Sequence, residues 1–167
     1  IIVVCLSNWV EYVKKRISNI RVVVGGDTRT ESSYLGLKAC NKKSKYVLIH
    51  DAARPLVSQQ IINSCLINLK KFQAVVPIVD CLDSIIENKK QSIVYLNRDK
   101  IKIIQTPQAF EYKQIFNAHK KNSFSESDDL SILLKQNPKL NYLFIKGSSL
   151  NIKITRLQDM QIVRSNI

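Results

Sequence analysis

Short runs of consecutive apolar residues, rich in isoleucine and valine, recur along the 167-residue chain. A strand that is apolar on both faces must be covered on both faces, as in a parallel sheet between helices. Helical spacing fills the intervals between the runs, as at Val10, Val13 and Ile17. This alternation predicts an α/β fold with a mainly parallel sheet sandwiched by helices. The predicted strands are residues 1–6, 20–24, 46–49, 74–79, 101–105 and 142–145, and the later predicted helices are about 111–120, 127–136 and 155–163.

A polar turn interrupts the alternation after Val79. The sequence DCLDSIIENKKQSIVYLNRDK places ENKKQ between two short β-branched stretches, which predicts a β-hairpin. A hairpin without a core of its own needs a surface to lie on, and a partner subunit is one candidate. We therefore expect a protruding arm at about residues 80–97.

Length and charge limit the class of protein. With 167 residues and 45% hydrophobic content, we expect one domain over residues 1–167. No apolar run approaches the roughly 18 residues of a membrane span, and residues 1–6 are too short for a signal peptide, so we expect a cytoplasmic protein without membrane contact. The net charge of +13 attracts polyanions. The lysine pairs are scattered and lack interleaved aromatic residues, which favours solvated faces over a nucleic-acid groove.

The chain has four cysteines, Cys5, Cys40, Cys65 and Cys81, each in or beside an apolar segment. No Cys-x-x-Cys motif or Cys/His cluster indicates zinc or a redox pair. We expect all four to be small buried hydrophobic residues.

Polar motifs follow several predicted strands, where the loops of an open α/β sheet converge on a ligand. GGDTRTES, residues 25–32, comes after the run that ends at Val24. Its glycines allow close backbone approach, Asp27 can accept hydrogen bonds, and Ser32 can cap the next helix, whose free N–H groups favour an anion. Gly-Gly-Asp is also an ordinary turn, so both interpretations stay open.

HDAARP, residues 50–55, follows the predicted strand YVLI. A strand-end aspartate such as Asp51 can bind a divalent metal or a substrate hydroxyl, and Arg54, held by Pro55, offers a forked set of donors suited to phosphate. The alternative is an Asp51–Arg54 ion pair that only stabilises the loop. His50 is expected to be a structural hydrogen-bonding residue, since no serine or cysteine nucleophile is paired with it in a known motif.

Three further motifs are weaker. QTPQAF, residues 105–110, could present Thr106 and Gln108 to a ligand after a strand, although a proline there is also common at a helix start. SDDLS, residues 127–131, is typical of a helix N-cap followed by acidic residues. GSSLNIKIT, residues 147–155, brings Lys153 to the end of a strand, where it could reach a site at the sheet edge. A single lysine is more often a solvated surface residue.

Taken in order, these motifs resemble the 2-C-methyl-D-erythritol 4-phosphate cytidylyltransferases. HDAARP, TPQ and NIK-T in this order and at these intervals are highly specific, whereas any one alone is not. The family's fold is a nucleotidyltransferase α/β sandwich with a β-arm that embraces a second subunit, so the resemblance implies a homodimer formed through the hairpin. The resemblance covers about residues 1–163 and rests on GGDTRTES, HDAARP, Val79-Asp80 with its hairpin, Asn97-Arg98, QTPQAF, SDD and NIKIT.

The resemblance also implies a reaction. The family joins CTP to 2-C-methyl-D-erythritol 4-phosphate with Mg²⁺, giving 4-diphosphocytidyl-2-C-methyl-D-erythritol and pyrophosphate, in non-mevalonate isoprenoid biosynthesis. By resemblance, Asp51 and Lys153 would be catalytic, and Asp51 would hold the metal. The residues implied for CTP are Gly26, Asp27, Ser32, Ala52 and Lys153, and those implied for the sugar phosphate are Asp51, Arg54, Arg98, Thr106, Ser127 and Lys153.

Three features depart from the family. The chain begins without methionine inside a β-branched run, and nothing before Ile1 supplies the Gly-x-Gly-x-Arg loop or the Pro-Lys-Gln segment that hold the CTP triphosphate. We therefore expect a chain that lacks its first strand and nucleotide loop. The family's Asp-Thr is Asp80-Cys81 here, and its Thr-Asp is Ser127-Asp128. Serine keeps a hydroxyl, whereas cysteine gives only a weak donor.

Other functions stay open. Ribitol 5-phosphate cytidylyltransferases share most of these motifs, although they tend to carry valine before the arginine, where HDAARP has alanine. A chain without the nucleotide loop could also be a non-catalytic remnant or a basic nucleic-acid-binding module.

Overall fold

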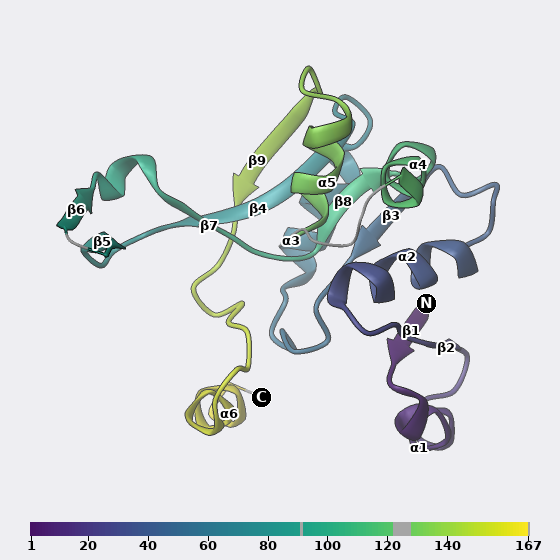
Figure 1. The fold of residues 1–167 in the computed structure, drawn as a ribbon. Helices are drawn as coiled ribbons and strands as arrows, with labels where there is room; N and C mark the ends of the chain where they lie inside the picture. The colour runs from purple at the N-terminus through teal and green to yellow at the C-terminus, as the bar shows by residue number, and fades with distance from the viewer. Residues whose placement is uncertain (91, 122–127, 167) are drawn as a thin grey trace. The chain divides into compact units, whose positions relative to one another are not determined.

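The computed structural model describes residues 1–90, 92–121 and 128–166. The chain forms two compact units, each made from two stretches of sequence. Figure 1 labels their helices and strands. The first unit is Ile1–Ile49 with Ala109–Asn141, and the second is His50–Gln108 with Tyr142–Ile167. Each unit contains both helices and strands, so the predicted α/β class is confirmed.

β1, β2 and β3 of the first unit form from the isoleucine- and valine-rich runs, because side chains branched at Cβ fit a pleated strand. β1 and β2 are parallel, with Val3 opposite Val22, and the 3-10 helix η1 and helix α1 make the crossover between them. β3 lies beside β8. The bounds are β1 (Ile2–Cys5), η1 (Ser7–Trp9), α1 (Val10–Arg16), β2 (Arg21–Val24), β3 (Tyr46–Ile49) and β8 (Gln108–Glu111), of which Gln108 belongs to the second unit.

Three helices supply much of the core of the first unit. α4 (Tyr112–Lys121) packs against α2 (Arg29–Ala39) and α5 (Asp129–Gln136). The Tyr112 hydroxyl donates a hydrogen bond to the Leu37 carbonyl at 3.1 Å, which ties α4 to the end of α2. The buried apolar side chains of these helices are Leu37, Ala39, Tyr112, Ile115, Ala118, Leu130, Ile132 and Leu133.

The sheet of the second unit is mixed. β4 (Ala74–Asp80) pairs in parallel with β9 (Tyr142–Lys146) and antiparallel with β7 (Lys102–Ile104). The prediction of a mainly parallel sheet is therefore corrected for this unit. The physical reason is the hairpin between β4 and β7, since an excursion without a crossover helix returns the chain in the opposite direction.

Helix α3 (Gln59–Asn68) covers this sheet by packing against β4 and β9. The Ser58 side chain caps the helix by accepting from the Ile61 amide at 3.3 Å. α6 (Leu157–Arg164) follows β9 in the chain. The fully or nearly buried apolar residues of α3, β4 and their connection are Ile61, Cys65, Leu69, Ala74, Val75 and Val76.

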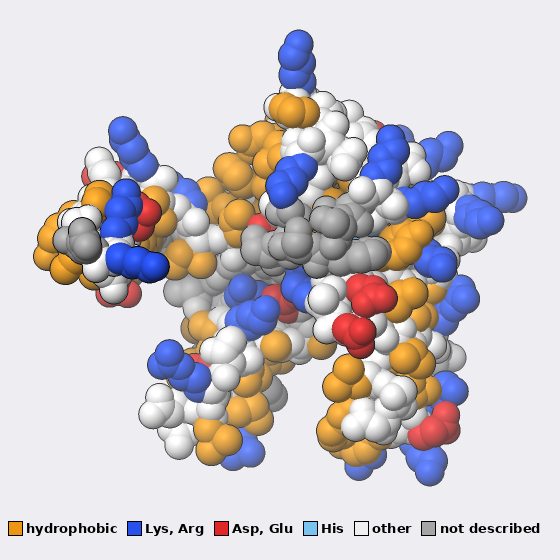
Figure 2. Space-filling view, viewed as in Figure 1, with side chains coloured by type: hydrophobic (Ala, Val, Ile, Leu, Met, Phe, Trp, Pro, Cys, Tyr) orange, Lys and Arg blue, Asp and Glu red, His pale blue; other side chains and the backbone are white. Residues whose placement is uncertain are grey.

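The predicted hairpin is present as β5 (Ile85–Lys89) and β6 (Ser92–Leu96), which pair antiparallel from Ile85 opposite Leu96 to Lys89 opposite Ser92. It is followed by the 3-10 helix η2 (Arg98–Lys100). Several of its apolar side chains lie open to solvent, including Ile93 at 60% and Tyr95 at 79% exposure. Figure 2 shows hydrophobic side chains on the surface of this hairpin.

Some local predictions were wrong. β8 was missed, because its four residues QAFE lack a β-branched run. Helix α2 is capped by Thr28 rather than Ser32, since the Thr28 side chain accepts from the Glu31 amide. Only Cys65 is buried among the four cysteines; Cys5, Cys40 and Cys81 are half-buried because they lie at the ends of elements. Among the described residues, no helix is long and apolar enough to cross a membrane.

Candidate active site

Three segments that the sequence singled out meet in the second unit. The Asp51 amide donates to the Thr106 hydroxyl oxygen at 3.0 Å, which joins HDAARP to QTPQ. The Ile154 amide donates to the Ala53 carbonyl at 2.8 Å, and Arg54 Nη1 donates to the Asn151 carbonyl at 2.7 Å, which join HDAARP to NIKIT. Segments separated by about 50 and 100 residues in the sequence thus form one cluster.

The cluster surrounds one carboxylate with two cations. Lys153 Nζ lies 3.0 Å from Asp51 Oδ2, and Arg54 Nε lies 3.6 Å from the same oxygen. The Asp51–Arg54 ion pair considered from the sequence is therefore present, but Lys153 joins it. The side chains of Asp51 and Arg54 are 14% and 12% exposed, whereas Lys153 is 42% exposed. One cation is in excess, so the local charge suits an anion such as phosphate.

His50 holds the bend of HDAARP in place. Its Nε2 lies 3.0 Å from the Arg54 carbonyl oxygen, and its Nδ1 lies 3.0 Å from the Thr106 hydroxyl. Because a carbonyl only accepts, the hydrogen-bond network assigns the proton to Nε2, and the Thr106 hydroxyl donates to Nδ1. This arrangement confirms the structural role expected for His50. Thr106 is buried, and its hydroxyl both accepts from Asp51 and donates to His50.

Two buried polar residues of the cluster, Gln105 and Asn151, were not singled out from the sequence. Asn151 Nδ2 donates to the Thr106 carbonyl at 2.8 Å, and Gln105 Nε2 donates to the Ser148 carbonyl at 2.8 Å. A Cβ at Gly147 would collide with Gln105 Oε1 and lie 3.0 Å from the Ile78 carbonyl oxygen, so a larger residue would displace the Gln105 amide. The sequence contains two weak signals: Gln105 is a polar residue at the end of a strand, and Asn151 is a polar residue two positions before Lys153.

In the first unit, Gly25–Thr28 folds back onto the first turn of α2. The Gly26 amide donates to Ser32 Oγ at 3.2 Å, and the Asp27 amide donates to Glu31 Oε2 at 2.9 Å. A Cβ at Gly26 would collide with the Glu31 side chain, so a larger residue here would displace Glu31 from the Asp27 amide. Asp27 itself is exposed. The loop therefore presents Asp27 to solvent on a backbone that Glu31 and Ser32 hold.

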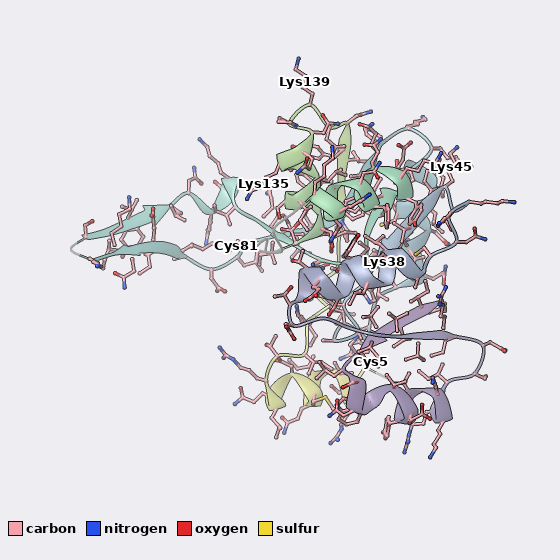
Figure 3. The ribbon with its side chains drawn as sticks, turned by 45° about the vertical axis from the view of Figure 1, so that its right-hand side comes forward. Cys5, Lys38, Lys45, Cys81, Lys135 and Lys139 are labelled. Atoms are coloured by element: carbon pink, nitrogen blue, oxygen red, sulfur yellow. The ribbon has the colours of Figure 1, made fainter. Side chains whose placement is uncertain are left out.

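Arg98 lies with a different set of residues at the base of the hairpin. Its Nη1 donates to the Leu82 carbonyl at 3.0 Å, and Lys102 Nζ pairs with Asp80 Oδ1 at 2.6 Å. The hydrogen bond and charge of Lys102 hold the pKa of the Asp80 carboxyl below its usual range. Cys81 lies in this region (Figure 3). The hollow here has a volume of about 350 Å³ and is lined by Asp80, Cys81, Leu82, Arg98, Asp99 and Lys102.

Two predicted residues remain. Ser127 lies outside the described residues, and the cap of α5 is Asp128, whose side chain accepts from the Ser131 amide at 3.1 Å. Ala52, expected at the nucleotide, is exposed next to Asp51. Among the residues that the structure describes, no group of three or more His, Cys, Asp or Glu side chains is placed to hold a metal ion. In the described part of the chain, Asp51 is the carboxylate that pairs with both Lys153 and Arg54.

Relatives with sequence similarity support one family. The protein is 36% identical over 163 residues to the bifunctional enzyme IspD/IspF of Pelagibacter ubique, a match that covers 96% of this chain and 43% of the relative. It is 35% identical over 173 residues to the 2-C-methyl-D-erythritol 4-phosphate cytidylyltransferase of Dictyoglomus thermophilum, covering 96% of this chain and 74% of the relative. The chain thus spans less than half of one relative and about three quarters of the other.

Solved structures agree. The 4-diphosphocytidyl-2C-methyl-D-erythritol synthase from Anaerococcus prevotii superposes with a TM-score of 0.86 at 30% identity, covering 99% of this chain and 76% of that chain. The bifunctional IspDF from Campylobacter jejuni superposes with a TM-score of 0.81 at 30% identity, covering 95% and 41%. The sequence model of IspD, 2-C-methyl-D-erythritol 4-phosphate cytidylyltransferase, matches residues 1–166. The chain therefore belongs to the 2-C-methyl-D-erythritol 4-phosphate cytidylyltransferase family.

Proposed function

We propose that this protein transfers the cytidylyl group of CTP to 2-C-methyl-D-erythritol 4-phosphate, in the non-mevalonate pathway of isoprenoid biosynthesis. The products are 4-diphosphocytidyl-2-C-methyl-D-erythritol and pyrophosphate. The observation that carries the proposal is the cluster in which Lys153 and Arg54 surround Asp51. HDAARP and NIKIT, which build it, resemble motifs of the family whose model matches residues 1–166.

The proposed reaction is an in-line displacement at phosphorus. A phosphate oxygen of methylerythritol phosphate forms a bond to the α-phosphorus of CTP, and the bond to the bridging oxygen of the β-phosphate breaks, so pyrophosphate leaves with the electron pair. The nucleophile is already an anion and needs no general base. Catalysis then depends on positioning and on positive charge at the phosphoryl oxygens. Lys153, a compact charge on a flexible stem, is suited to this task.

The side chain of Arg54 is held in one orientation by two contacts. One of its terminal nitrogens is engaged by the Asn151 carbonyl, and its Nε faces Asp51. The guanidinium plane is therefore fixed before a ligand arrives. We assign Arg54 to the phosphate of the acceptor, because a fixed fork recognises phosphate with defined geometry.

Asp51 is the residue assigned to Mg²⁺. A single carboxylate fits this ion only where substrate phosphates and water complete the coordination, which is the usual arrangement for Mg²⁺ in nucleotide-dependent enzymes. The adjacent Lys153 and Arg54 would favour the approach of those phosphates. When bound, the ion would neutralise charge on the phosphate oxygens.

The remaining assignments follow the family motifs. Asp27, Gly26 and Ser32 are assigned to the cytidine part of CTP, together with Ala52. Asp27 is exposed at the tip of its loop, whereas Ser32 Oγ already accepts from the Gly26 amide and would act through that loop. Arg98, Thr106 and Ser127 are assigned to methylerythritol phosphate. Thr106 would act mainly by holding HDAARP, because its hydroxyl is engaged on both sides.

We also propose a homodimer formed through the β5–β6 hairpin. The support is the exposure of apolar side chains on a two-stranded ribbon, since such a ribbon is marginally stable alone in water. Phosphorylated substrates do not cross a bilayer unaided, so the proposal places the enzyme in the cytoplasm, where CTP is made.

The test is a steady-state assay of pyrophosphate release by the full-length protein with CTP and methylerythritol phosphate. Lys153→Ala should lower kcat/KM by about 100-fold, the scale expected when one charge-stabilising group is removed. Lys139→Ala is the matched control, because Lys139 is an exposed lysine in the first unit, and it should stay within about twofold of the wild type (Figure 3). Equal activity of the two variants would refute the role of Lys153.

The same assay decides between acceptors. Ribitol 5-phosphate should be a poor substrate when the two alcohol phosphates are compared at equal concentration. A higher kcat/KM for ribitol 5-phosphate would assign the protein to that neighbouring activity, and no release of pyrophosphate with either acceptor would leave the non-catalytic alternative.

A further inference from the structure

A buried ionic cluster lies in the first unit, outside the residues assigned to the reaction. Asp129, at the start of α5, receives a hydrogen bond from Arg29 Nη2 at 2.7 Å and lies 2.9 Å from His119 Nε2. The side chains of Asp129 and His119 are fully buried, and Arg29 is 32% exposed. We propose that this cluster positions the loop of Gly25–Thr28 that presents Asp27, so that Arg29, Asp129 and His119 are positioning residues for nucleotide binding. The inference rests on the proposed binding of CTP by that loop.

The carboxylate of Asp129 is held charged in the interior. Burial alone would raise the pKa of this carboxyl, but the hydrogen bond from His119 and the adjacent Arg29 guanidinium outweigh burial and hold the pKa below its usual range. Because a carboxylate only accepts, the proton between the two side chains lies on His119 Nε2. An ionised Asp129 that has both partners can hold Arg29 in one place.

Arg29 transmits this restraint directly to the loop. It is the first residue of α2 and follows the cap residue Thr28. Within the same turn, Glu31 Oε2 accepts from the Asp27 amide at 2.9 Å, and Ser32 Oγ accepts from the Gly26 amide at 3.2 Å. The turn that holds the loop backbone is thus the turn that Asp129 anchors.

The anchor itself rests on packed side chains. The ring of Tyr34, in α2, is stacked with the His119 ring at 6.5 Å between centroids and 3° between planes, and it also stacks with Phe116 of α4. Ring stacking therefore joins α2 to α4, and the contacts of Arg29 and His119 with Asp129 join both helices to α5. A shift of the α2 N-terminus would break contacts to both partner helices.

A purely structural role is the competing explanation, and its consequences differ. Buried ion pairs can be close to neutral for stability, because desolvation offsets the attraction. A structural pair would change the melting temperature when removed, without a selective effect on the loop. If the cluster positions the loop, substitutions in it should speed hydrogen exchange of the loop amides and weaken CTP binding. These effects should be larger than those of other substitutions that lower stability by a similar amount.

The experiment compares variants in the full-length protein. Arg29→Ala removes the link, Arg29→Lys keeps the charge, and Asp129→Asn removes the carboxylate while keeping its shape. Tyr112→Phe is the matched control, because it removes the buried hydrogen bond to Leu37 near the opposite end of the same helix α2. The readouts are hydrogen exchange of the Gly26 and Asp27 amides in ligand-free protein, melting temperature, and the split of kcat and KM for CTP.

Loss of one charged hydrogen bond typically changes an equilibrium constant by a factor of about ten or more. We expect Arg29→Ala and Asp129→Asn to speed exchange of the two amides about tenfold and to raise KM for CTP about tenfold, with kcat within about twofold. Arg29→Lys should recover most of the effect, and Tyr112→Phe should change neither quantity.

Wild-type exchange and wild-type KM in Arg29→Ala would overturn the inference, as would equal effects of Arg29→Ala and Tyr112→Phe. Failure of the proposed function has a separate signature: the wild-type protein would show no response to CTP. In that case the exchange rates of the ligand-free variants still decide whether the cluster holds the loop.

Discussion

Asn151 is the residue at which the three segments of the active-site cluster converge. Its side chain is fully buried, Nδ2 donates to the Thr106 carbonyl, and its own carbonyl accepts from Arg54. In Asn151→Asp, a carboxylate oxygen would replace Nδ2 and face the Thr106 carbonyl, so the hydrogen bond would be lost. A buried polar group left unsatisfied costs about 1–3 kcal/mol. We expect a melting temperature lower by several degrees and kcat lower by at least about tenfold, measured by thermal unfolding and pyrophosphate release. Asn63→Asp, at an exposed position of α3, is the control, and equal behaviour of the two variants would contradict the prediction.

Asp129 gives the protein a specific dependence on acid. Its pKa is lower in the folded state than the value of about 3.9 expected when unfolded. A depressed pKa contributes stability that is fully present above the unfolded value and is lost as the pH falls through the folded value. We therefore expect the difference in unfolding free energy between wild type and Asp129→Asn to shrink as the pH falls from about 5 to below the unfolded value of about 3.9. Denaturant titration at several pH values measures it, and a difference that does not change over this range would refute the linkage.

At the scale of single residues, the sequence indicated which residue types could bind a ligand, but not which residues contact one another. The sequence singled out Asp51, Arg54 and Lys153 as charged residues in loops that follow strands, and the structure brings their side chains together. The cap of α2 was expected at Ser32 rather than at Thr28, because both are hydroxyl residues in one short tract. Gln105 and Asn151 were missed because their importance comes from an approach between residues 46 apart, which no local pattern records.

At the scale of elements, the hairpin is the feature with a function still to be tested. β5 and β6 expose apolar side chains, including Tyr95 at 79%. We expect Tyr95→Lys to weaken the proposed dimer, because it places a charge in an interface that would otherwise bury an aromatic ring. Sedimentation equilibrium should show a dissociation constant raised by at least about tenfold, while the melting temperature extrapolated to low concentration stays the same. Asn88→Lys, on the facing strand of the same hairpin, should leave the dimer intact; dissociation by both variants, or by neither, would contradict the role of Tyr95.

Elements were predictable where one local pattern dominates. The isoleucine- and valine-rich runs correspond to β1, β2, β3, β4, β7 and β9, because side chains branched at Cβ favour strands. Strand direction was not predictable: β7 runs antiparallel to β4 because the hairpin returns the chain, and an apolar run has the same composition in either direction. β8 was missed because its four residues carry neither a β-branched run nor alternation.

At the scale of the whole molecule, the net charge of +13 must be separated from the charge of the active-site cluster. Lys38, Lys45, Lys135 and Lys139 are all exposed and come from several segments of the first unit (Figure 3). Exposed charges farther than about 8 Å from a ligand are largely screened at physiological salt. The scattered lysines should therefore raise the rate of encounter with CTP at low salt without setting its affinity at physiological salt.

We expect substitution of Lys153 and substitution of four exposed lysines to affect the kinetics with CTP differently. A variant with Lys38, Lys45, Lys135 and Lys139 all changed to glutamine should keep KM for CTP within about twofold of the wild-type value at 0.15 M salt. At 0.01 M salt, its kcat/KM should be lower than that of the wild type. Lys153→Ala should instead remain defective at both salt concentrations, because Lys153 lies 3.0 Å from Asp51 inside the cluster. If the fourfold variant raised KM at 0.15 M as much as Lys153→Ala, the overall positive field, rather than the Asp51–Arg54–Lys153 geometry, would be what binds the nucleotide.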